Sequence, residues 1–256
     1  MSGWRVLRHL LRQPLWLAGW VAMAGSLVFQ SLALHFGAVS VVQPLLVSEL
    51  IMGLLVRRVW LGQAIGASTW WAALVTGLGL LGFLLAASPS TGRVVPATRD
   101  WITASLVVGV VVGIVVALAQ RGSPRRRAAL FASATAAVWA IEAAYIKATT
   151  DVLSAHGVGS LLSHWPLYAL VVAGVIGLAC EQTALHVGPL SVSQPAIVII
   201  DPVVSVVLGL VIYGERLHAG PGHLALAAVA FVVMSVGVVQ LTRTAPATMN
   251  RDVHRL

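Results

Sequence analysis

The chain has 256 residues, of which 59% are hydrophobic and only 9% are charged. Soluble domains carry about 25% charged residues, so this composition excludes a soluble enzyme, a disordered chain, collagen and a coiled coil. The single cysteine, Cys180, excludes an intrachain disulfide and a cysteine-based zinc cluster.

Long apolar stretches follow one another along the whole chain. A helix needs about 20 mostly apolar residues to cross the hydrocarbon core of a bilayer. The sequence predicts eight such helices, over 15–36, 39–56, 71–87, 102–120, 129–149, 166–186, 190–213 and 224–242. Runs such as Val107–Val112 do not alternate between apolar and polar residues, so they favour helices over the strands of a membrane barrel. The expected fold class is an all-α integral membrane protein.

The arginines predict how these helices are oriented. Cytoplasmic loops of membrane proteins carry an excess of Lys and Arg. With both termini in the cytoplasm, the inner segments hold twelve arginines, namely Arg5, Arg8, Arg12, Arg57, Arg58, Arg121, Arg125, Arg126, Arg127, Arg243, Arg251 and Arg255. The outer loops hold three, namely Arg93, Arg99 and Arg216. We therefore expect a multi-pass protein of the cytoplasmic membrane, with a basic cytoplasmic tail over 244–256. Because the net charge of +8 lies beside apolar spans, it does not indicate nucleic acid binding.

An internal repeat is the most specific signal in the sequence. At an offset of 151 residues, the segment Ala33–Pro44 aligns with Ala184–Pro195, and eight of the twelve positions are identical. The first copy's short turn is predicted outside and the second copy's turn inside, so the two copies are inverted. Inverted helical repeats are a recurrent plan of secondary transporters, with a substrate path near the bilayer midplane. The expected halves are residues 1–125 and 126–243, each with four of the predicted spans.

Each repeat carries a Gln-Pro pair about five residues into a span. Pro44 and Pro195 each remove a helical hydrogen bond, and the freed carbonyls must be met by neighbours or by a cavity. Gln43 and Gln194 lie beside them and are candidates for the substrate path. The alternative interpretation is two kinked packing helices, because proline is common in membrane helices.

Four acidic residues and one lysine fall within the predicted spans. Glu49, Glu142, Glu181, Asp201 and Lys147 each cost at least about 2.5 kcal/mol at the helix centre, so such residues face the bundle interior and mark pathways. Asp201 and Glu181 rank first because they lie near the middle of long spans. Glu49 falls one residue out of step with Asp201 in the repeat. The alternatives are protonated or paired structural groups, and snorkelling to the interface for Lys147.

Sequence patterns of enzymes and ATP-driven pumps are missing from the chain. It has no His-x-x-x-His or Cys-x-x-Cys spacing, no nucleophile elbow around a serine and no glycine-rich phosphate loop before a lysine. We therefore expect neither an enzyme nor a bound cofactor.

The repeated segment and Tyr213–Leu217 resemble the drug/metabolite transporter superfamily, with the greatest similarity to its EamA-like and NIPA-like bacterial branches. The resemblance covers Gln13 to Leu241. It implies an inverted-repeat bundle with a central cavity that acts as a carrier without hydrolysing ATP. Members commonly have nine or ten helices, so the eight predicted spans suggest that the family's first helix is lacking. Glu215, in the family's Gly-Glu-Arg-Leu turn, is expected to be a loop and cap residue.

Three functions remain open from the sequence. The first is a carrier that moves a small metabolite, drug or ion by alternating access. The second is a NIPA-like transporter of magnesium or another divalent cation, whose oxygen ligands would come from the intramembrane carboxylates. The third is a non-transporting membrane subunit that stabilises a partner protein. The expected partners are membrane lipid and a small-molecule or ion substrate, and a homodimer is left open.

Overall fold

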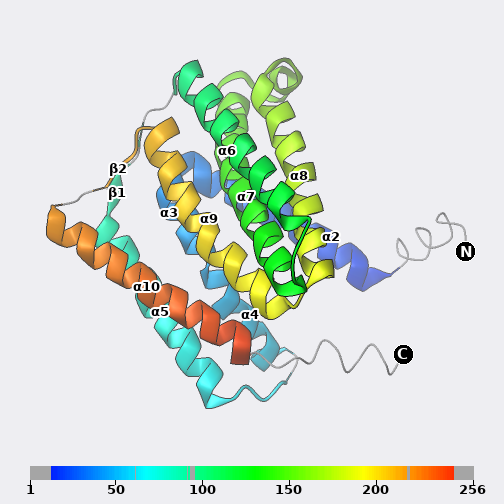
Figure 1. Cartoon of the computed structure of the whole chain (residues 1–256). Helices are drawn as coiled ribbons and strands as arrows, with labels where there is room; N and C mark the ends of the chain where they lie inside the picture. The colour runs from blue at the N-terminus through cyan, green and yellow to red at the C-terminus, as the bar shows by residue number, and fades with distance from the viewer. Residues whose placement is uncertain (1–12, 61, 91, 93–95, 218–219, 245–256) are drawn as a thin grey trace, which may run out of the picture.

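Every predicted span is helical, and one of them, 39–56, is divided between two helices. The computed structural model describes residues 13–60, 62–90, 92, 96–217 and 220–244 (Figure 1). Its helices are α2 (Pro14–Phe36), α3 (Val39–Leu46), α4 (Ser48–Val59), α5 (Ala67–Ala87), α6 (Thr98–Ala119), α7 (Pro124–His156), α8 (Trp165–Val187), α9 (Leu190–Ile212) and α10 (Pro221–Thr244), with a 3₁₀ helix η1 (Val158–Ser163). The predicted basic tail, apart from Thr244, and the arginines before Gln13 lie outside the described residues.

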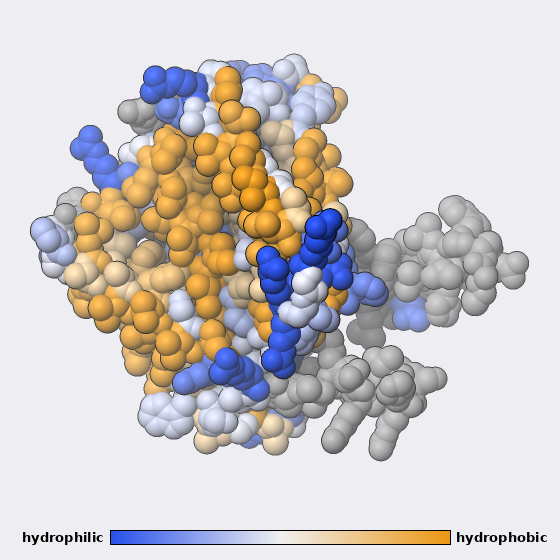
Figure 2. Space-filling model, in the orientation of Figure 1, coloured by the Kyte–Doolittle hydropathy of each residue, from blue (hydrophilic) through white to orange (hydrophobic). Residues whose placement is uncertain are grey.

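The helices have the length and apolar character of membrane spans. Within the described part of the chain, seven helical segments are long and apolar enough to cross a bilayer, and α3 with α4 counts as one of them, Val39–Val59. The described apolar part of α2 is shorter, Val21–Phe36, although the helix itself has 23 residues. Figure 2 shows apolar residues over the middle of the visible face and hydrophilic residues gathered near its two ends. The chain is therefore a multi-pass helical membrane protein.

Helix α7 is the central pillar of the bundle. It is 33 residues long, and 72% of its apolar window is buried, against 44% or less for every other membrane-length helix among the described residues. It packs against α8, α9, α6 and α2. Ala132, Ala136, Ala140 and Ala144 follow one another at four-residue spacing and are fully buried. Small residues at this spacing allow neighbouring helices to approach closely without a driving force from water.

Helices α5 and α10 form a second close pair, side by side at the lower left of Figure 1. A Cβ built at Gly79 would lie 2.4 Å from the backbone nitrogen of Met234. A Cβ at Gly237 would lie 2.5 Å from the Thr76 hydroxyl oxygen. The two helices therefore meet through glycines on both sides, and no larger residue fits at either position.

The two copies of the repeated turn lie at opposite ends of α7. The carbonyl of Gly37, in the turn between α2 and α3, accepts a hydrogen bond from Lys147. Gly188, in the turn between α8 and α9, lies against the start of α7, where its Cβ would be 2.6 Å from the Cβ of Ala128. Ala128 and Lys147 are nineteen positions apart on one helix, which is about 30 Å at 1.5 Å per residue. We call residues 34–40 the upper turn and residues 185–191 the lower turn.

A two-residue antiparallel ladder joins the loops that follow α5 and α9. Strand β1 (Pro89–Ser90) pairs with β2 (Arg216–Leu217), with Pro89 opposite Leu217 and Ser90 opposite Arg216. The sequence analysis did not predict this ladder, because two residues carry too little pattern. It ties the first half of the chain to the second at the upper end of the bundle.

Two helix boundaries differ from the prediction. The span expected over 129–149 runs from Pro124 to His156, so Lys147 is well inside the helix rather than near its end. The first proline-containing span breaks into α3 and α4 at Val47, three residues after Pro44. Helix α9, in contrast, continues through both Pro195 and Pro202. The two equivalent prolines therefore do not have the same effect on their helices.

Candidate functional site

Three of the four predicted intramembrane carboxyls are brought together. Glu49 lies on α4, Glu142 on α7 and Asp201 in the middle of α9. The Asp201 carboxyl is close enough to those of Glu49 and Glu142 to interact with both electrostatically. Its Oδ1 also accepts a hydrogen bond from Ser205 Oγ at 3.0 Å. We call Glu49, Glu142 and Asp201 the interior carboxyl group.

Glu142 and its neighbour Trp139 pack against two glycines of α8. A Cβ at Gly174 would lie 3.3 Å from Glu142 Oε1, and a Cβ at Gly177 would lie 2.8 Å from the Trp139 ring. In the described part of the chain, the carboxyls of Glu142 and Glu181 make no hydrogen bond or ion pair. Glu181 interacts with no member of the interior carboxyl group and is only partly buried. Its predicted role in the path stays a prediction.

Metal ligation was one of the open interpretations of these acids. Among the described residues, no group of three or more His, Cys, Asp or Glu side chains is arranged so that it could hold a metal ion.

The two predicted Gln-Pro pairs lie in unlike surroundings. Gln43 is 2% exposed, and its side-chain nitrogen has no hydrogen-bond partner among the described residues. Gln194 is exposed, whereas Pro44 and Pro195 are both buried. An unpartnered buried amide costs about 1–3 kcal/mol, so the Gln43 amide is available to a ligand or a water molecule.

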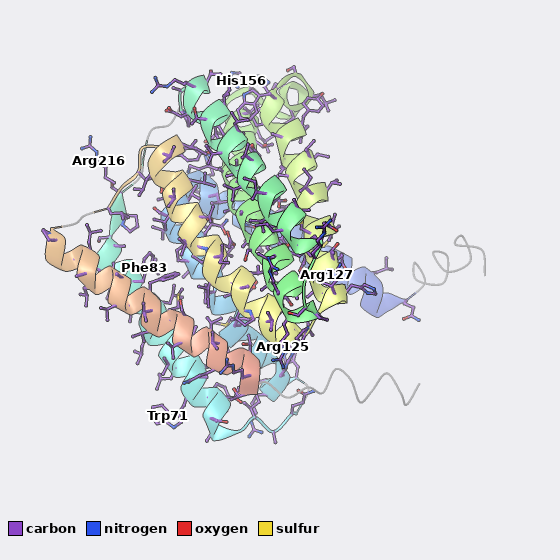
Figure 3. The ribbon with its side chains drawn as sticks, viewed as in Figure 1. Trp71, Phe83, Arg125, Arg127, His156 and Arg216 are labelled. Atoms are coloured by element: carbon purple, nitrogen blue, oxygen red, sulfur yellow. The ribbon has the colours of Figure 1, made fainter. Side chains whose placement is uncertain are left out.

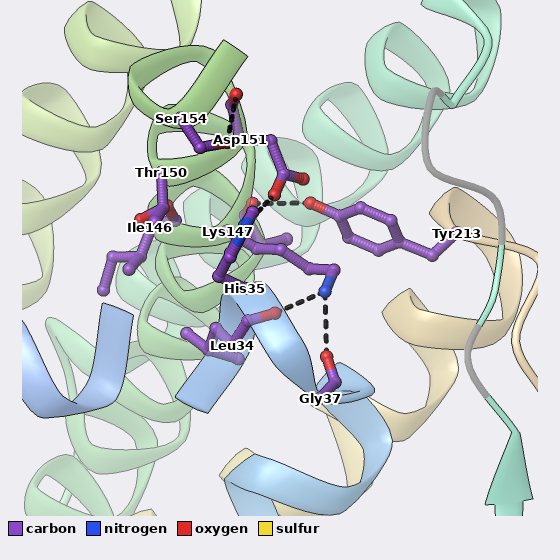
Figure 4. Close-up of polar contacts among 10 residues, drawn as sticks. Leu34, His35, Gly37, Ile146, Lys147, Thr150, Asp151, Ser154 and Tyr213 are labelled. Atoms are coloured by element: carbon purple, nitrogen blue, oxygen red, sulfur yellow. Dashed lines mark hydrogen bonds and ion pairs between the residues drawn. The ribbon is translucent and has the colours of Figure 1, made fainter. Parts of the chain in front are cut away.

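The upper turn is held by α7 through contacts that sequence analysis did not anticipate. Lys147 Nζ donates hydrogen bonds to the carbonyls of Leu34 and Gly37, the latter at 2.8 Å (Figure 4). Four residues further along α7, the Asp151 carboxylate lies 2.7 Å from His35 Nδ1. Lys147 thus satisfies carbonyls at the end of α2 instead of snorkelling outward. No local pattern pairs these residues, because they are more than 100 positions apart.

Glu215 also binds the upper turn, from the loop that follows α9. Its Oε1 accepts a hydrogen bond from the Val39 amide at 2.7 Å, and its Oε2 accepts from the Ser40 amide at 3.1 Å and from Ser40 Oγ at 2.5 Å. The residue is 4% exposed. Its carboxylate lies over Gly209, where a Cβ would be 2.3 Å from Oε2. The expectation that Glu215 is a cap residue is confirmed, since it caps the first turn of α3.

Aromatic side chains fill the space beneath this cap. The Trp101 ring stacks on Tyr145 at 5.6 Å between centroids and meets Trp165 and Tyr213 edge-on at 5.1 and 5.8 Å. The Tyr213 phenol donates a hydrogen bond to the Ala144 carbonyl at 2.9 Å.

The lower turn has the same sequence motif but few of these contacts. Val39 is fully buried, whereas its counterpart Leu190 is 44% exposed. Ser40 is also fully buried, and its counterpart Ser191 is exposed. No side chain in the described part of the chain caps the start of α9 at Leu190. Two equivalent segments thus occupy a closed environment at one end of the bundle and an open one at the other.

A second pair of equivalent turns ends the helices that follow these segments. Gly62 has φ 60° and Gly214 has φ 61°, the left-handed conformation that favours glycine after a helix. The amide of Gln63 donates to the carbonyl of Arg57 at 3.1 Å, and the amide of Glu215 donates to that of Gly209 at 3.2 Å. Gln63 therefore occupies the position of Glu215 at an offset of 152 residues.

The offset changes from 151 to 152 between the repeated motif and these turns. The change corresponds to one residue fewer in α3 and α4 than in α9, and the helix break at Val47 lies between the two pairs of turns. At the offset of 152, Glu49 aligns with Asp201, whereas at the offset of 151 the two acids are one residue out of step.

Comparison with known proteins gives one relative of note. The chain is 29% identical over 240 residues to an uncharacterized protein of Corynebacterium glutamicum. The alignment covers 93% of this chain and 82% of that protein. No protein-family model matches the chain, and no solved structure matches it. The similarity therefore extends over nearly the whole bundle and brings no function with it.

The described interior offers carboxyl, amide and hydroxyl groups in apolar surroundings. Ionisable groups within membrane helices mark substrate paths, ion paths and proton relays. The chemistry that these groups support is reversible binding of a polar solute, a cation or a proton.

Proposed function

We propose that this protein is a secondary transporter of the drug/metabolite type, which moves a small metabolite, drug or ion across the cytoplasmic membrane by alternating access. One observation carries the proposal. Two copies of one sequence motif lie at opposite ends of α7, and only the upper copy is buried and capped. A carrier caught with one end closed and the other open has this arrangement.

The internal repeat supplies the physical reason. Two segments of like sequence and opposite orientation have similar energies in each other's environments, so the bundle can close at either end. The matching turns at Gly62 and Gly214, and the alignment of Glu49 with Asp201, extend the likeness beyond the motif itself. These matches support an inverted repeat.

The interior carboxyl group supports a polar passage at mid-height. Glu49 is exposed and lies in the middle of the membrane-length segment Val39–Val59. A charged group at this depth costs at least about 2.5 kcal/mol beside acyl chains, so water or protein is expected around it. Glu142 on α7 and Asp201 on α9 lie within electrostatic range of each other.

The orientation follows from the arginines. Arg125 and Arg127 lie near the lower end of the bundle, and Arg216 lies near the upper end (Figure 3). Under the positive-inside rule the lower end is cytoplasmic. The structure then corresponds to a carrier that is closed toward the outside.

A flux panel in proteoliposomes tests the proposal. Purified protein is reconstituted, and uptake of labelled amines, amino acids, sugars, common drugs and Mg²⁺ is measured with and without a pH gradient. We expect uptake of at least one organic solute, and we expect Asp201→Asn to reduce it at least about tenfold. Ser235→Ala is the matched control, because that hydroxyl bonds only to the Phe231 carbonyl of its own helix.

The other outcomes separate the remaining interpretations. Uptake of Mg²⁺ alone, abolished in Asp201→Asn, would replace the organic-solute carrier by a divalent-cation transporter. No uptake of any solute, together with stable co-purification of a second protein, would overturn transport in favour of a non-transporting subunit.

A further inference from the structure

We infer that Glu215 and Gln63 are the two ends of one gating device, and that the charge difference between them selects which end of the carrier is closed at rest. The contact of Glu215 with Val39 and Ser40 is the upper latch. The lower latch is the equivalent contact of Gln63 with Leu190 and Ser191, which forms when the lower end closes. This inference rests on the proposed alternating access.

The upper latch joins the two halves of the chain. Glu215 follows α9, whereas Val39 and Ser40 begin α3, 175 to 176 positions earlier. One carboxylate accepts three hydrogen bonds in a site that is 4% exposed. Hydrogen bonds to a charged acceptor are about twice as strong as neutral ones, and a helix N-terminus favours a negative charge. The contact therefore holds α3 firmly against the end of α9.

The lower end has the same scaffold for a latch. Gly62 and Gly214 share one backbone conformation, and the next residue in each case returns its amide to the carbonyl six positions back. Gln63 therefore follows the end of α4 in the same backbone geometry in which Glu215 follows the end of α9. Gln63 makes no side-chain hydrogen bond to any described residue.

The lower end also has the same target. Leu190 and Ser191 match Val39 and Ser40 at the repeat offset, so α9 presents two amides and a serine hydroxyl as α3 does. Among the described residues, no side chain caps the start of α9, and Leu190 and Ser191 are both exposed. The lower latch therefore has two halves, the Gln63 side chain and the start of α9. The two halves are not bonded to each other in this structure.

The difference between the two latches is one of charge. A glutamine oxygen accepts the same hydrogen bonds as a carboxylate without the attraction of a full negative charge to the helix N-terminus. The charge favours the end closed by glutamate, and the contacts of Lys147 and Asp151 with the upper turn act in the same direction. This accounts for an upper end that is closed while the lower end is open.

Cysteine protection tests the inference in the full-length protein. In a Cys180→Ser background, Val39→Cys and Leu190→Cys each keep the backbone amide that the latch uses. The rate of modification by a small maleimide is measured in detergent, where both ends are accessible to the reagent. We expect Leu190→Cys to react fast and Val39→Cys to be protected.

The charge of each latch is then changed. Glu215→Gln should raise the rate at Val39→Cys about tenfold, the equilibrium equivalent of about 1.4 kcal/mol. Gln63→Glu should lower the rate at Leu190→Cys and raise it at Val39→Cys by a similar factor. Unchanged rates at both cysteines in Gln63→Glu, or continued protection of Val39→Cys in Glu215→Gln, would overturn the inference.

One further variant guards against misfolding. Gly209→Ala displaces the Glu215 carboxylate sterically without altering its charge, and it should expose Val39→Cys as Glu215→Gln does. If Glu215→Gln unfolds, the Gly209→Ala and Gln63→Glu rates still decide the question. Rates that exchange between the two ends without any solute flux would uphold the latches and contradict transport. Flux with unexchanged rates would contradict the latches alone.

Discussion

The hydroxyl of Ser40 lies 2.5 Å from the carboxylate of Glu215, although 175 positions separate the two residues. Ser40 begins the first proline-containing segment, and Glu215 ends the turn after the second. The contact is therefore made between the two copies of the repeat. It explains why a glutamate is tolerated in a buried position, since three donors meet its two oxygens.

Removing the Ser40 hydroxyl should weaken this contact without abolishing it. Ser40→Ala keeps both backbone donors to Glu215, so we expect a loss of about 1 kcal/mol in the free energy of unfolding. Unfolding can be followed by the reaction of a fluorescent thiol reagent with Cys180, which is buried and is the only cysteine in the sequence. Ser191→Ala is the control, because its hydroxyl is exposed and caps nothing. Equal losses in the two variants would contradict the assigned role of Ser40.

Adding a methyl group at the glycine contact between α5 and α10 should destabilise the bundle. In Gly79→Ala the new methyl group would lie 2.4 Å from the backbone nitrogen of Met234, so the helices must separate. We expect a loss of at least about 2 kcal/mol, of the size seen for overpacked cores. Gly109→Ala is the control, since its Cβ meets nothing within 4 Å. The readout is the midpoint of thermal unfolding, and a midpoint for Gly79→Ala above that of Gly109→Ala would refute the close approach.

Truncating Trp101 should open the aromatic cluster at the upper end. Its ring contacts Tyr145, Trp165 and Tyr213 and is 6% exposed, so Trp101→Ala is expected to cost about 3–5 kcal/mol. Trp71→Ala, from a residue that is 66% exposed, should cost much less. Denaturation in detergent compares the two variants. A larger loss of stability in Trp71→Ala than in Trp101→Ala would contradict the burial assigned to the two residues.

Replacing Lys147 by methionine should release the end of α2. Lys147→Met leaves the carbonyls of Leu34 and Gly37 without their donor, at about 1–3 kcal/mol for the unsatisfied groups. We expect faster amide hydrogen exchange in residues 34–40 and no change in residues 185–191. Thr183→Ala, which removes a bond to the Ala179 carbonyl of its own helix, serves as the comparison. Protection that is lost equally in both turns would indicate general unfolding instead.

Much of the fold could be predicted because each membrane helix is marked by a long apolar run in its own local sequence. The start of α9 at Leu190 was predicted to the residue, since Gly188 and Pro189 interrupt an apolar run. The extra length of α7 was missed because Arg125 to Arg127 and Asp151 are polar and lie outside the apolar stretch. The strand pair was missed because Pro89–Ser90 has no pattern apart from its distant partner.

The candidate site could be predicted only as a set of residue types. Glu49, Glu142 and Asp201 were selected by their cost in a bilayer, which depends on sequence position alone. That Glu181 makes no contact with them could not be read from spacing, because the packing of α8 on α7 decides it. The partners of Lys147 and His35 come from helices far apart in the sequence, so no window of residues contains both members of either pair.

The sequence by itself determined that the chain spans a membrane repeatedly, where its helices lie and that it repeats a motif. These properties depend on the length of each apolar run and on the identity of its residues. The free energy of transferring a segment into the bilayer is set by that segment alone. Only the tertiary structure decided that the upper copy of the motif is capped by Glu215 while the lower copy is left open. Two segments of like sequence have like intrinsic preferences, so the difference between them arises from contacts with residues more than a hundred positions away.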